Sequence, residues 1–251
     1  MVLYFAWRGG WFLFALCAFV SIAGVREMAG MLGCRGIHVW EPAAQTLGIA
    51  CVWAAAYGPE WLWNGFPLMA VFLGLVMPVA GRRWFSIPDG VATQAALLYA
   101  PYLIAHLQLL WRMPGGERLV VLAILATWAT DTAAYFGGVW AGRHKLCPSI
   151  SPAKTIEGAL FGAGAGMLTG GGVAAWAGLA RAQGLLIGLA AAVMAQTGDL
   201  AESAIKRYTG VKDSGKLIPG HGGVLDRFDS LLFSGPMVYW VVFFLFRRTG
   251  V

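Results

Sequence analysis

Eight long apolar runs occupy most of this sequence and constrain its fold more than any other feature. They cover residues 4–25, 43–58, 61–80, 90–111, 118–140, 156–180, 183–205 and 230–246. Most of them reach the length of about 20 residues that an α-helix needs to cross a bilayer. Because the runs are continuous rather than alternating with a period of two, they predict helices and not a β-barrel. We therefore predict an all-α, polytopic transmembrane helical bundle with about eight spans, in a range of about seven to nine.

The composition agrees with a lipid solvent. Apolar residues make up 59% of the 251 residues and charged residues only 12%, whereas soluble domains have about 45–50% and about 25%. Little length remains for a soluble module, so we expect a single integral membrane domain over residues 1–251. Within it, residues 1–115 form N-terminal helices with few polar motifs, and residues 116–251 form the catalytic helices and cytoplasmic loops. Arg8-Gly9-Gly10 breaks the first run, which predicts a short preceding helix.

Basic residues are divided unequally between the two sides of this bundle. The connections at residues 26–42, 81–89, 141–155 and 206–229 carry twelve Lys and Arg residues, and the opposite side carries six. Positive charge favours the cytoplasmic side of a membrane. The first set of connections is therefore predicted to face the cytoplasm, where nucleoside triphosphates are available. Membrane orientation accounts for the net charge of +6 without a nucleic-acid partner.

Small residues gather in the run at 156–180. Gly158, Gly162, Gly164 and Gly166 lie there among apolar residues. In a bilayer, small residues let helices approach closely. The glycines therefore predict tight helix packing rather than a phosphate-binding loop.

Two aspartates interrupt apolar runs. Asp131 lies well inside the run at 118–140, and Asp199 lies near the end of the run at 183–205. A carboxylate at the centre of a membrane helix costs about 2.5–3.5 kcal/mol on insertion scales. One interpretation is neutralisation by a Lys or Arg on a neighbouring helix. The other is ligation of a hard cation, because Mg²⁺ usually takes one or two carboxylates together with substrate phosphates.

The polar segment at residues 147–158 predicts an anion site at the start of a helix. Pro152 suits the first helical turn, Ser151 can cap it, and the exposed N–H groups can hold an anion. Lys154 adds a positive charge beside this helix start. The basic run at 143–145 strengthens the prediction of an anion site. The alternative interpretation is an ordinary capped helix with no ligand.

The longest polar stretch covers residues 203–229. It combines five Lys or Arg residues and three aspartates with a glycine-rich turn. Gly220, Gly222 and Gly223 permit a positive φ and close backbone approach to a ligand. Asp226 and Asp229 are three residues apart and share a face if this part is helical. A merely basic loop would not need this mixture of charges, so we predict a functional segment.

These segments resemble the phosphatidate cytidylyltransferases, the membrane enzymes that make CDP-diacylglycerol. The most specific part reads Ser203-x-Ile-Lys206-Arg207, then Lys212-Asp213, then His221-Gly-Gly-x-x-Asp226-Arg227-Phe-Asp229. Upstream, the resemblance continues in Asp131-Thr-Ala-Ala-Tyr135-Phe-Gly-Gly and in Ser151-Pro-x-Lys154-Thr-x-Glu157-Gly. The motifs cover residues 127–235, and the N-terminal half matches only in hydropathy. Family members usually carry a complete extra span before Arg26 and Glu27, which leaves the helix count open.

The resemblance implies transfer of CMP from CTP to phosphatidate, giving CDP-diacylglycerol and pyrophosphate for phospholipid biosynthesis. It also implies Mg²⁺ dependence, with Asp199 and Asp226 as ligands. Asp131 is a further candidate ligand, and K⁺ is allowed as a second ion. Bound metal would screen the triphosphate and stabilise the leaving oxygens.

The resemblance assigns roles to the remaining polar residues. The candidate catalytic residues are Asp199, Asp226, Lys206, Arg207, Lys212, His221 and Arg227. The candidate substrate-binding residues are Ser151, Lys154, Thr155, Glu157, Lys145, Ser203, Asp213, Gly222, Gly223 and Asp229. We expect His221 to position a substrate rather than to act as a base, because a phosphate monoester with a second pKa of about 6 is already ionised near neutral pH.

Two other functions are compatible with parts of the sequence. CTP-dependent polyprenol kinases and archaeal-type lipid cytidylyltransferases share parts of the Ser-Pro-x-Lys motif, although the full pattern at 203–229 argues against the kinases. An ion-coupled transporter would show matching polar breaks in two inverted halves, whereas here the polar motifs crowd the C-terminal half. We expect CTP, phosphatidate and the bilayer as partners and no nucleic acid, and allow for a homodimer. The expected location is the cell (inner) membrane, multi-pass, with a cytoplasmic active site.

Overall fold

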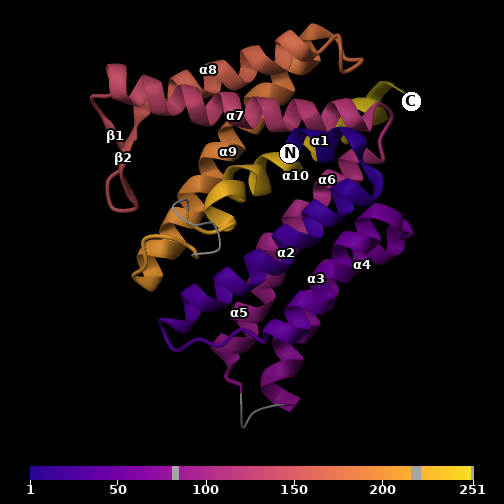
Figure 1. Ribbon diagram of the computed structural model, residues 1–251, viewed down its shortest axis with the longest axis vertical. Helices are drawn as coiled ribbons and strands as arrows, with labels where there is room; N and C mark the ends of the chain where they lie inside the picture. Colours follow the sequence, from indigo (N-terminus) through magenta and orange to yellow (C-terminus); the bar gives the residue numbers. More distant parts are fainter. Residues whose placement is uncertain (81–84, 216–221, 250–251) are drawn as a thin grey trace. The chain divides into compact units, whose positions relative to one another are not determined.

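A computed structural model describes residues 1–80, 85–215 and 222–249, and most of these residues are helical (Figure 1). The helices are α1 (Val2–Arg8), α2 (Gly10–Gly33), α3 (Glu41–Tyr57), α4 (Glu60–Ala80), α5 (Ile87–Leu97), the π-helix η1 (Leu98–Tyr102), α6 (Leu103–Trp111), α7 (Gly116–Ala141), α8 (Ile156–Val173), α9 (Arg181–Thr209) and α10 (Leu225–Thr249). Two short strands, β1 (Lys145–Cys147) and β2 (Ser151–Thr155), form a hairpin. The predicted all-α class is confirmed.

The eight apolar runs coincide with helical structure, apart from the end of the run at 156–180, where α8 stops at Val173. Among the described residues, five helices are long and apolar enough to cross a membrane: α2, α4, α7, α9 and the part of α10 at Leu225–Arg247. The run at 90–111 is divided among α5, η1 and α6. A polytopic helical membrane fold is thus confirmed, whereas the count of eight spans is not.

The predicted break after the first few residues is present. Helix α1 ends at Arg8, and the next residue, Gly9, has a φ of 58°. Trp111 occupies the space that a Cβ atom on Gly9 would need. Both the backbone conformation and the close indole ring therefore require glycine where α1 gives way to α2.

The chain forms two compact units. Unit 1 contains residues 1–9, 109–204 and the chain from Asp229 onwards, which includes α7, the hairpin, α8 and most of α9 and α10. Unit 2 contains the described residues of 10–108 and 205–228, which include α2 to α5 and the junction between α9 and α10. The expectation of one integral membrane domain stays a prediction.

In unit 1, α8 packs closely on α7 through glycines spaced four residues apart, and the two helices run side by side (Figure 1). A Cβ atom on Gly162 would lie 2.9 Å from the Thr130 carbonyl oxygen. One on Gly166 would lie 2.7 Å from the Ala192 Cβ atom of α9. Tight packing at these glycines is confirmed. Gly164 has no neighbour within 4 Å of its Cβ position, so its inclusion was wrong.

In unit 2, α2 packs on α3 and η1, and α4 packs on α5. Leu13, Leu97 and Ile104 are fully buried in this core. Pro101 lies inside η1 and has no N–H to donate to the helical ladder, which accounts for the local π-helical turn. This packing fixes α2, whose buried Glu27 is part of the site described below.

The predicted helix start at Ser151 and Pro152 is wrong. Residues Ser151–Thr155 form β2, which pairs antiparallel with β1. Helix α8 begins later, at Ile156, and its N-cap is Thr155, whose hydroxyl oxygen accepts a 3.1 Å hydrogen bond from the Gly158 N–H. A two-stranded hairpin has only edge strands, where the missing N–H of Pro152 is tolerated.

Candidate active site

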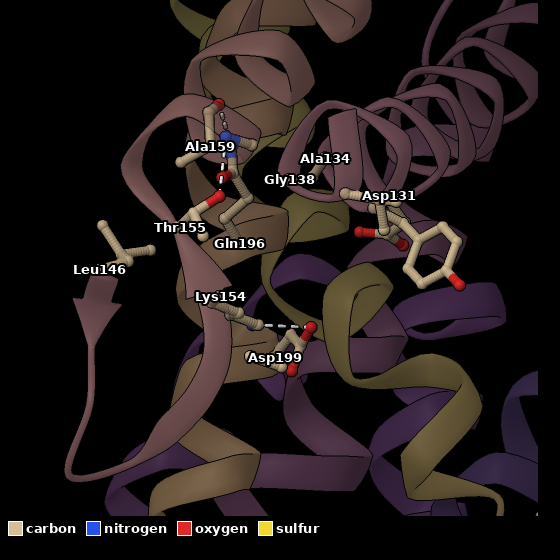
Figure 2. A pocket seen from close by; sticks show the side chains of 13 residues that line it. Asp131, Ala134, Gly138, Leu146, Lys154, Thr155, Ala159, Gln196 and Asp199 are labelled. Carbon is tan, nitrogen blue, oxygen red and sulfur yellow. Dashed lines mark hydrogen bonds and ion pairs between the residues drawn. The ribbon is translucent and has the colours of Figure 1, made fainter. Parts of the chain in front are cut away.

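A cavity of about 300 Å³ lies in unit 1 among α7, the hairpin, α8 and α9 (Figure 2). Its polar lining consists of Asp131, Lys154, Thr155, Gln196 and Asp199. The rest of the lining is apolar or glycine: Ala134, Tyr135, Gly138, Val139, Leu146, Ala153, Gly158 and Ala159. We call this cavity the carboxylate pocket. It brings together four sequence-predicted site residues from three separate segments.

Lys154 and Asp199 form an ion pair at this pocket. Lys154 extends from β2, and its Nζ atom lies 2.7 Å from Asp199 Oδ2 on α9, as the dashed line in Figure 2 marks. The Lys154 side chain is 24% exposed and that of Asp199 is 37% exposed. A pair this open contributes at most about 1 kcal/mol to stability. Neutralisation of Asp199 by a basic residue is therefore observed, with a strand rather than a helix supplying the lysine, and the pair is weak enough to exchange for a ligand.

Further carboxylates surround Asp199. Asp229 is close enough to Asp199, Asp131 and the buried Glu202 for their negative charges to repel one another. Asp131 accepts a 3.2 Å hydrogen bond from the Ser230 hydroxyl. Within the described residues of unit 1, Lys154 is the cation that pairs with the aspartates of this group. Within the described residues of unit 1, this group therefore contains more carboxyl groups than cations, and carboxylate oxygens favour the binding of a hard cation.

The residues of this region fit a magnesium ion that shares its coordination with a substrate. Carboxylate oxygens are preferred ligands of Mg²⁺, which usually takes one or two from the protein and the rest from phosphates and water. Among the described residues, no group of three or more His, Cys, Asp or Glu side chains is placed to hold a metal by itself. A site at Asp199 and Asp131 that is completed by substrate phosphates agrees with both observations.

Other predicted residues of unit 1 support the pocket without lining it. Glu157 Oε2 accepts a 3.0 Å hydrogen bond from the Arg143 N–H, and Glu157 Oε1 lies 2.6 Å from His144 Nδ1. Glu157 therefore ties the first turn of α8 to the segment that leads into the hairpin. Lys145 pairs with Thr155 across the hairpin, and Ser151 pairs with Cys147. The hairpin in turn carries Lys154 to the pocket.

Two contacts near Asp199 complete this picture. The Ser203 hydroxyl donates a 3.4 Å hydrogen bond to Asp199 Oδ1 one helical turn away. Gln196 lines the pocket and was missed by the sequence analysis. The missed signal is an amide inside an apolar run, three residues before Asp199 and hence on the same helix face.

Unit 2 contains a second cluster of predicted residues, centred on Asp226. Asp226 Oδ1 lies 2.6 Å from Lys206 Nζ. Asp226 Oδ2 accepts hydrogen bonds from the Ser214 N–H and hydroxyl at 3.0 and 2.9 Å, and from the Gly223 N–H at 2.7 Å. Gly222 has the predicted positive φ, at 82°. The side chains of Lys206 and Asp226 are only 15% and 13% exposed, so this pair is far more enclosed than Lys154 and Asp199.

The cluster also contains a residue that the sequence analysis did not select. Glu27 of α2 is 8% exposed and accepts hydrogen bonds from the Val224 N–H and the Leu225 N–H at 2.7 and 2.8 Å. Glu27 lies just past the apolar run at 4–25, so the cost of a carboxylate inside such a run, which selected Asp131, did not apply to it, and its burial in α2 became visible only in the structure. We call Glu27, Lys206, Ser214, Gly223 and Asp226 the Asp226 cradle.

The remaining predicted residues of unit 2 lie outside the cradle. Arg207, Lys212, Asp213 and Arg227 are exposed. His221 lies outside the described residues. The predicted phosphate contacts of Arg207, Lys212 and Arg227 stay predictions.

Comparison with known proteins decides the family. A family model described as "Cytidylyltransferase family" matches residues 1–245, which is nearly the whole chain. The chain is a member of the cytidylyltransferase family. The resemblance seen in the motifs is thereby confirmed, and it extends through the N-terminal helices that matched only in hydropathy.

Individual relatives of this cytidylyltransferase agree with the family match. A protein named phosphatidate cytidylyltransferase from Synechocystis sp. is 36% identical over 270 residues, covering 94% of this chain and 90% of its own. One of the same name from Staphylococcus saprophyticus is 31% identical, covering 92% and 90%. The uncharacterized protein YnbB of Escherichia coli is 34% identical, covering 76% and 73%.

Proposed function

We propose that this cytidylyltransferase transfers CMP from CTP to phosphatidate, giving CDP-diacylglycerol and pyrophosphate. The observation that carries the proposal is the carboxylate pocket, where Lys154 and the aspartates at 131 and 199 meet beside an apolar wall. The relatives named phosphatidate cytidylyltransferase support the choice of lipid acceptor. The full motif at 203–229 favours this function over a polyprenol kinase.

In the proposed reaction, a phosphate oxygen of phosphatidate attacks the α-phosphorus of CTP. One P–O bond forms, the bond to the β-phosphate breaks, and pyrophosphate leaves with the bonding electrons. The attacking phosphate is already largely ionised near neutral pH, with a second pKa of about 6, so no strong base is needed. Two polyanions must meet, and the site must supply positive charge.

Within unit 1, Lys154 is the proposed source of that charge. Its ion pair with Asp199 is partly exposed, so the lysine can turn to the phosphates of CTP when they enter the pocket. Thr155 lines the same pocket, and Ser203 orients Asp199 through its hydrogen bond. Tyr135 and Val139 give the pocket an apolar side, which suits a lipid whose acyl chains stay in the bilayer.

We propose that Asp199 and Asp131 hold Mg²⁺, which when bound screens the phosphate charges and stabilises the leaving pyrophosphate. Asp226 is already bonded to Lys206, Ser214 and Gly223, and its role as a further ligand stays a prediction. The same proposal includes K⁺ as a second ion. It also places the protein in the cell (inner) membrane, with the site facing the cytoplasm.

An assay of the purified protein tests the function. CTP labelled in the cytidine ring is supplied with phosphatidate in detergent micelles, with Mg²⁺ or with excess EDTA. We expect labelled lipid and stoichiometric pyrophosphate with Mg²⁺, and neither with EDTA. In a parallel reaction with a polyprenol and CTP labelled at the γ-phosphate, transfer of that label to the lipid, without cytidine in the lipid, would instead identify a kinase. Ion-driven uptake into proteoliposomes without CTP turnover would identify a transporter.

A further inference from the structure

Glu27 is a buried carboxylate whose contacts run to the most motif-rich segment of the chain. Its Oε1 atom accepts the Val224 N–H, and its Oε2 atom accepts both the Leu225 N–H and the Ser214 hydroxyl, the latter at 2.9 Å. A Cβ atom on Gly215 would lie 2.7 Å from Glu27 Oε1. A small residue is therefore required where the loop closes over this carboxylate.

These contacts make Glu27 a cap for α10 that another helix supplies. The first N–H groups of a helix have no partner within the helix, and Leu225 is the first residue of α10. A carboxylate at this end is also favoured by the helix dipole. Because Asp226 directly follows Leu225, fixing the Val224 and Leu225 backbone fixes the point from which the Asp226 side chain extends.

Ser214 connects the two carboxylates of the Asp226 cradle. Its hydroxyl oxygen lies 2.9 Å from Glu27 Oε2 and 2.9 Å from Asp226 Oδ2. A hydroxyl has a single proton and donates it to one acceptor at a time. The Ser214 N–H also donates to Asp226, so the position of Ser214 affects both carboxylates.

Helix α2 holds the other end of the same segment as well. Arg35, just beyond α2, donates a 2.6 Å hydrogen bond from Nε to the Tyr208 carbonyl oxygen near the end of α9. Its guanidinium carbon lies 5.5 Å from the centre of the Tyr208 ring. Contacts from this region of the chain therefore hold the end of α9 and the beginning of α10.

We propose that Glu27 is a positioning residue for CMP transfer, which holds the Val224 and Leu225 backbone so that Asp226 and Lys206 keep their active geometry. Glu27 does not touch the substrate in this role. The kinetic part of the proposal rests on the proposed function. The structural part, the hold on the start of α10, can be tested without any turnover.

Glu27→Gln is the sharpest variant because it keeps the size of the side chain. Each Glu27 oxygen accepts a hydrogen bond from a backbone N–H, so the amide nitrogen of glutamine must face either the Val224 N–H or the Leu225 N–H, whichever way the amide is turned. Loss of a hydrogen bond to a charged group corresponds to about a ten- to hundredfold effect. We therefore expect kcat/KM of the folded enzyme to fall by about ten- to a hundredfold.

Asp89→Asn provides a matched control in the same unit. Asp89 is 5% exposed and caps α5, accepting hydrogen bonds from the Ser86 N–H and the His38 N–H at 2.7 and 2.6 Å. Burial raises the pKa of the Asp89 carboxyl, but these hydrogen bonds outweigh it and hold the pKa below its ordinary value. We expect Asp89→Asn to lower thermal stability and to leave kcat/KM of the folded enzyme within about twofold.

Hydrogen–deuterium exchange gives the readout that needs no turnover. We expect faster exchange at residues 211–215 and 222–228 in Glu27→Gln, and faster exchange confined to residues 86–93 in Asp89→Asn. If Glu27→Gln does not fold, Ser214→Ala replaces it, with faster exchange at residues 222–228 and a smaller loss of kcat/KM.

Two results would overturn the positioning role. One is unchanged exchange together with kcat/KM within about twofold of the wild type. The other is a loss of activity that merely follows the folded fraction, as in Asp89→Asn. A wild-type enzyme that fails to use phosphatidate would reject the proposed function, while the exchange data would still decide whether Glu27 holds the start of α10.

Discussion

The carboxylate pocket and the Asp226 cradle each contain an aspartate paired with a lysine, but the two pairs differ in how fully they are bonded. Asp226 receives a lysine, two backbone N–H groups and a hydroxyl, and is 13% exposed. Asp199 is 37% exposed, pairs with Lys154 and receives one long hydrogen bond from Ser203. A nearly saturated carboxylate stabilises local structure, whereas an open one beside other negative charges keeps oxygens for a ligand.

The largest expected effect is the loss of turnover when Asp199, the more open of the two carboxylates, is replaced. Asp199→Asn should lower kcat by at least about a hundredfold, because it removes a proposed ligand and one of the charges that attract Mg²⁺. Its thermal stability should remain at or above that of the wild type, since repulsion with Asp229 is relieved. Turnover and melting temperature in detergent check both parts. Near-normal turnover would remove Asp199 from the chemistry.

The second prediction concerns Asp226, whose oxygens are nearly saturated with hydrogen bonds. Asp226→Asn should lower the free energy of unfolding by about 1–3 kcal/mol, because an amide nitrogen must face Lys206 or the donors at Ser214 and Gly223. The melting temperature should fall by several degrees, and turnover should be lost as well. Thermal melts of Asp226→Asn and Asp199→Asn in the same detergent test this. Equal stability of the two variants would contradict a structural role that is greater for Asp226 than for Asp199.

A smaller effect is expected at the lysine of the open pair. Lys154→Ala should raise KM for CTP by about tenfold, because one charge-assisted phosphate contact is lost. Stability should change by no more than about 1 kcal/mol, as for any exposed ion pair. Arg118→Ala removes a charge from α7 away from the pocket and serves as the control. A fall in stability without a change in KM would show that Lys154 is structural.

The smallest expected effect is a change in stability, which is compared at two glycines. Gly222→Ala should destabilise the Asp226 cradle by about 1–2 kcal/mol, because φ is positive and the new Cβ atom would lie 2.7 Å from Asp226 Oδ2. Gly164→Ala, in a helix with open space around the site, should instead be neutral or stabilising by up to about 1 kcal/mol. Thermal melts of both variants in the same detergent test this. An unchanged melting temperature for Gly222→Ala would show that the Asp226 cradle is less tightly packed at this residue.

Several features of the fold and the site were predictable because they depend on consecutive residues. Hydropathy placed α7 and α9, and the conformational freedom of glycine predicted the break at Gly9 and the positive φ of Gly222. The cost of a carboxylate in an apolar run selected Asp131 and Asp199, which line one cavity. The same rule did not reach Glu27, because α2 continues to Gly33, beyond the apolar run at 4–25.

Other features could not be predicted from neighbouring residues. Ser151 and Pro152 suit a helix start locally, but pairing with β1 makes them part of a strand. That strand, rather than a helix, brings Lys154 to Asp199. The family motifs identified the charged residues without indicating which of them would pair with one another.

The sequence by itself determined that this chain is a polytopic helical membrane protein with the motifs of a cytidylyltransferase, because hydropathy and motif spacing are properties of consecutive residues. Only the tertiary structure decided which carboxylates are saturated and which stay open. Glu27 lies 197 positions from Val224, yet the two are joined by a hydrogen bond. Such a contact exists only once the backbone has folded, since it depends on which N–H groups the packing of α2 leaves within reach of a carboxylate.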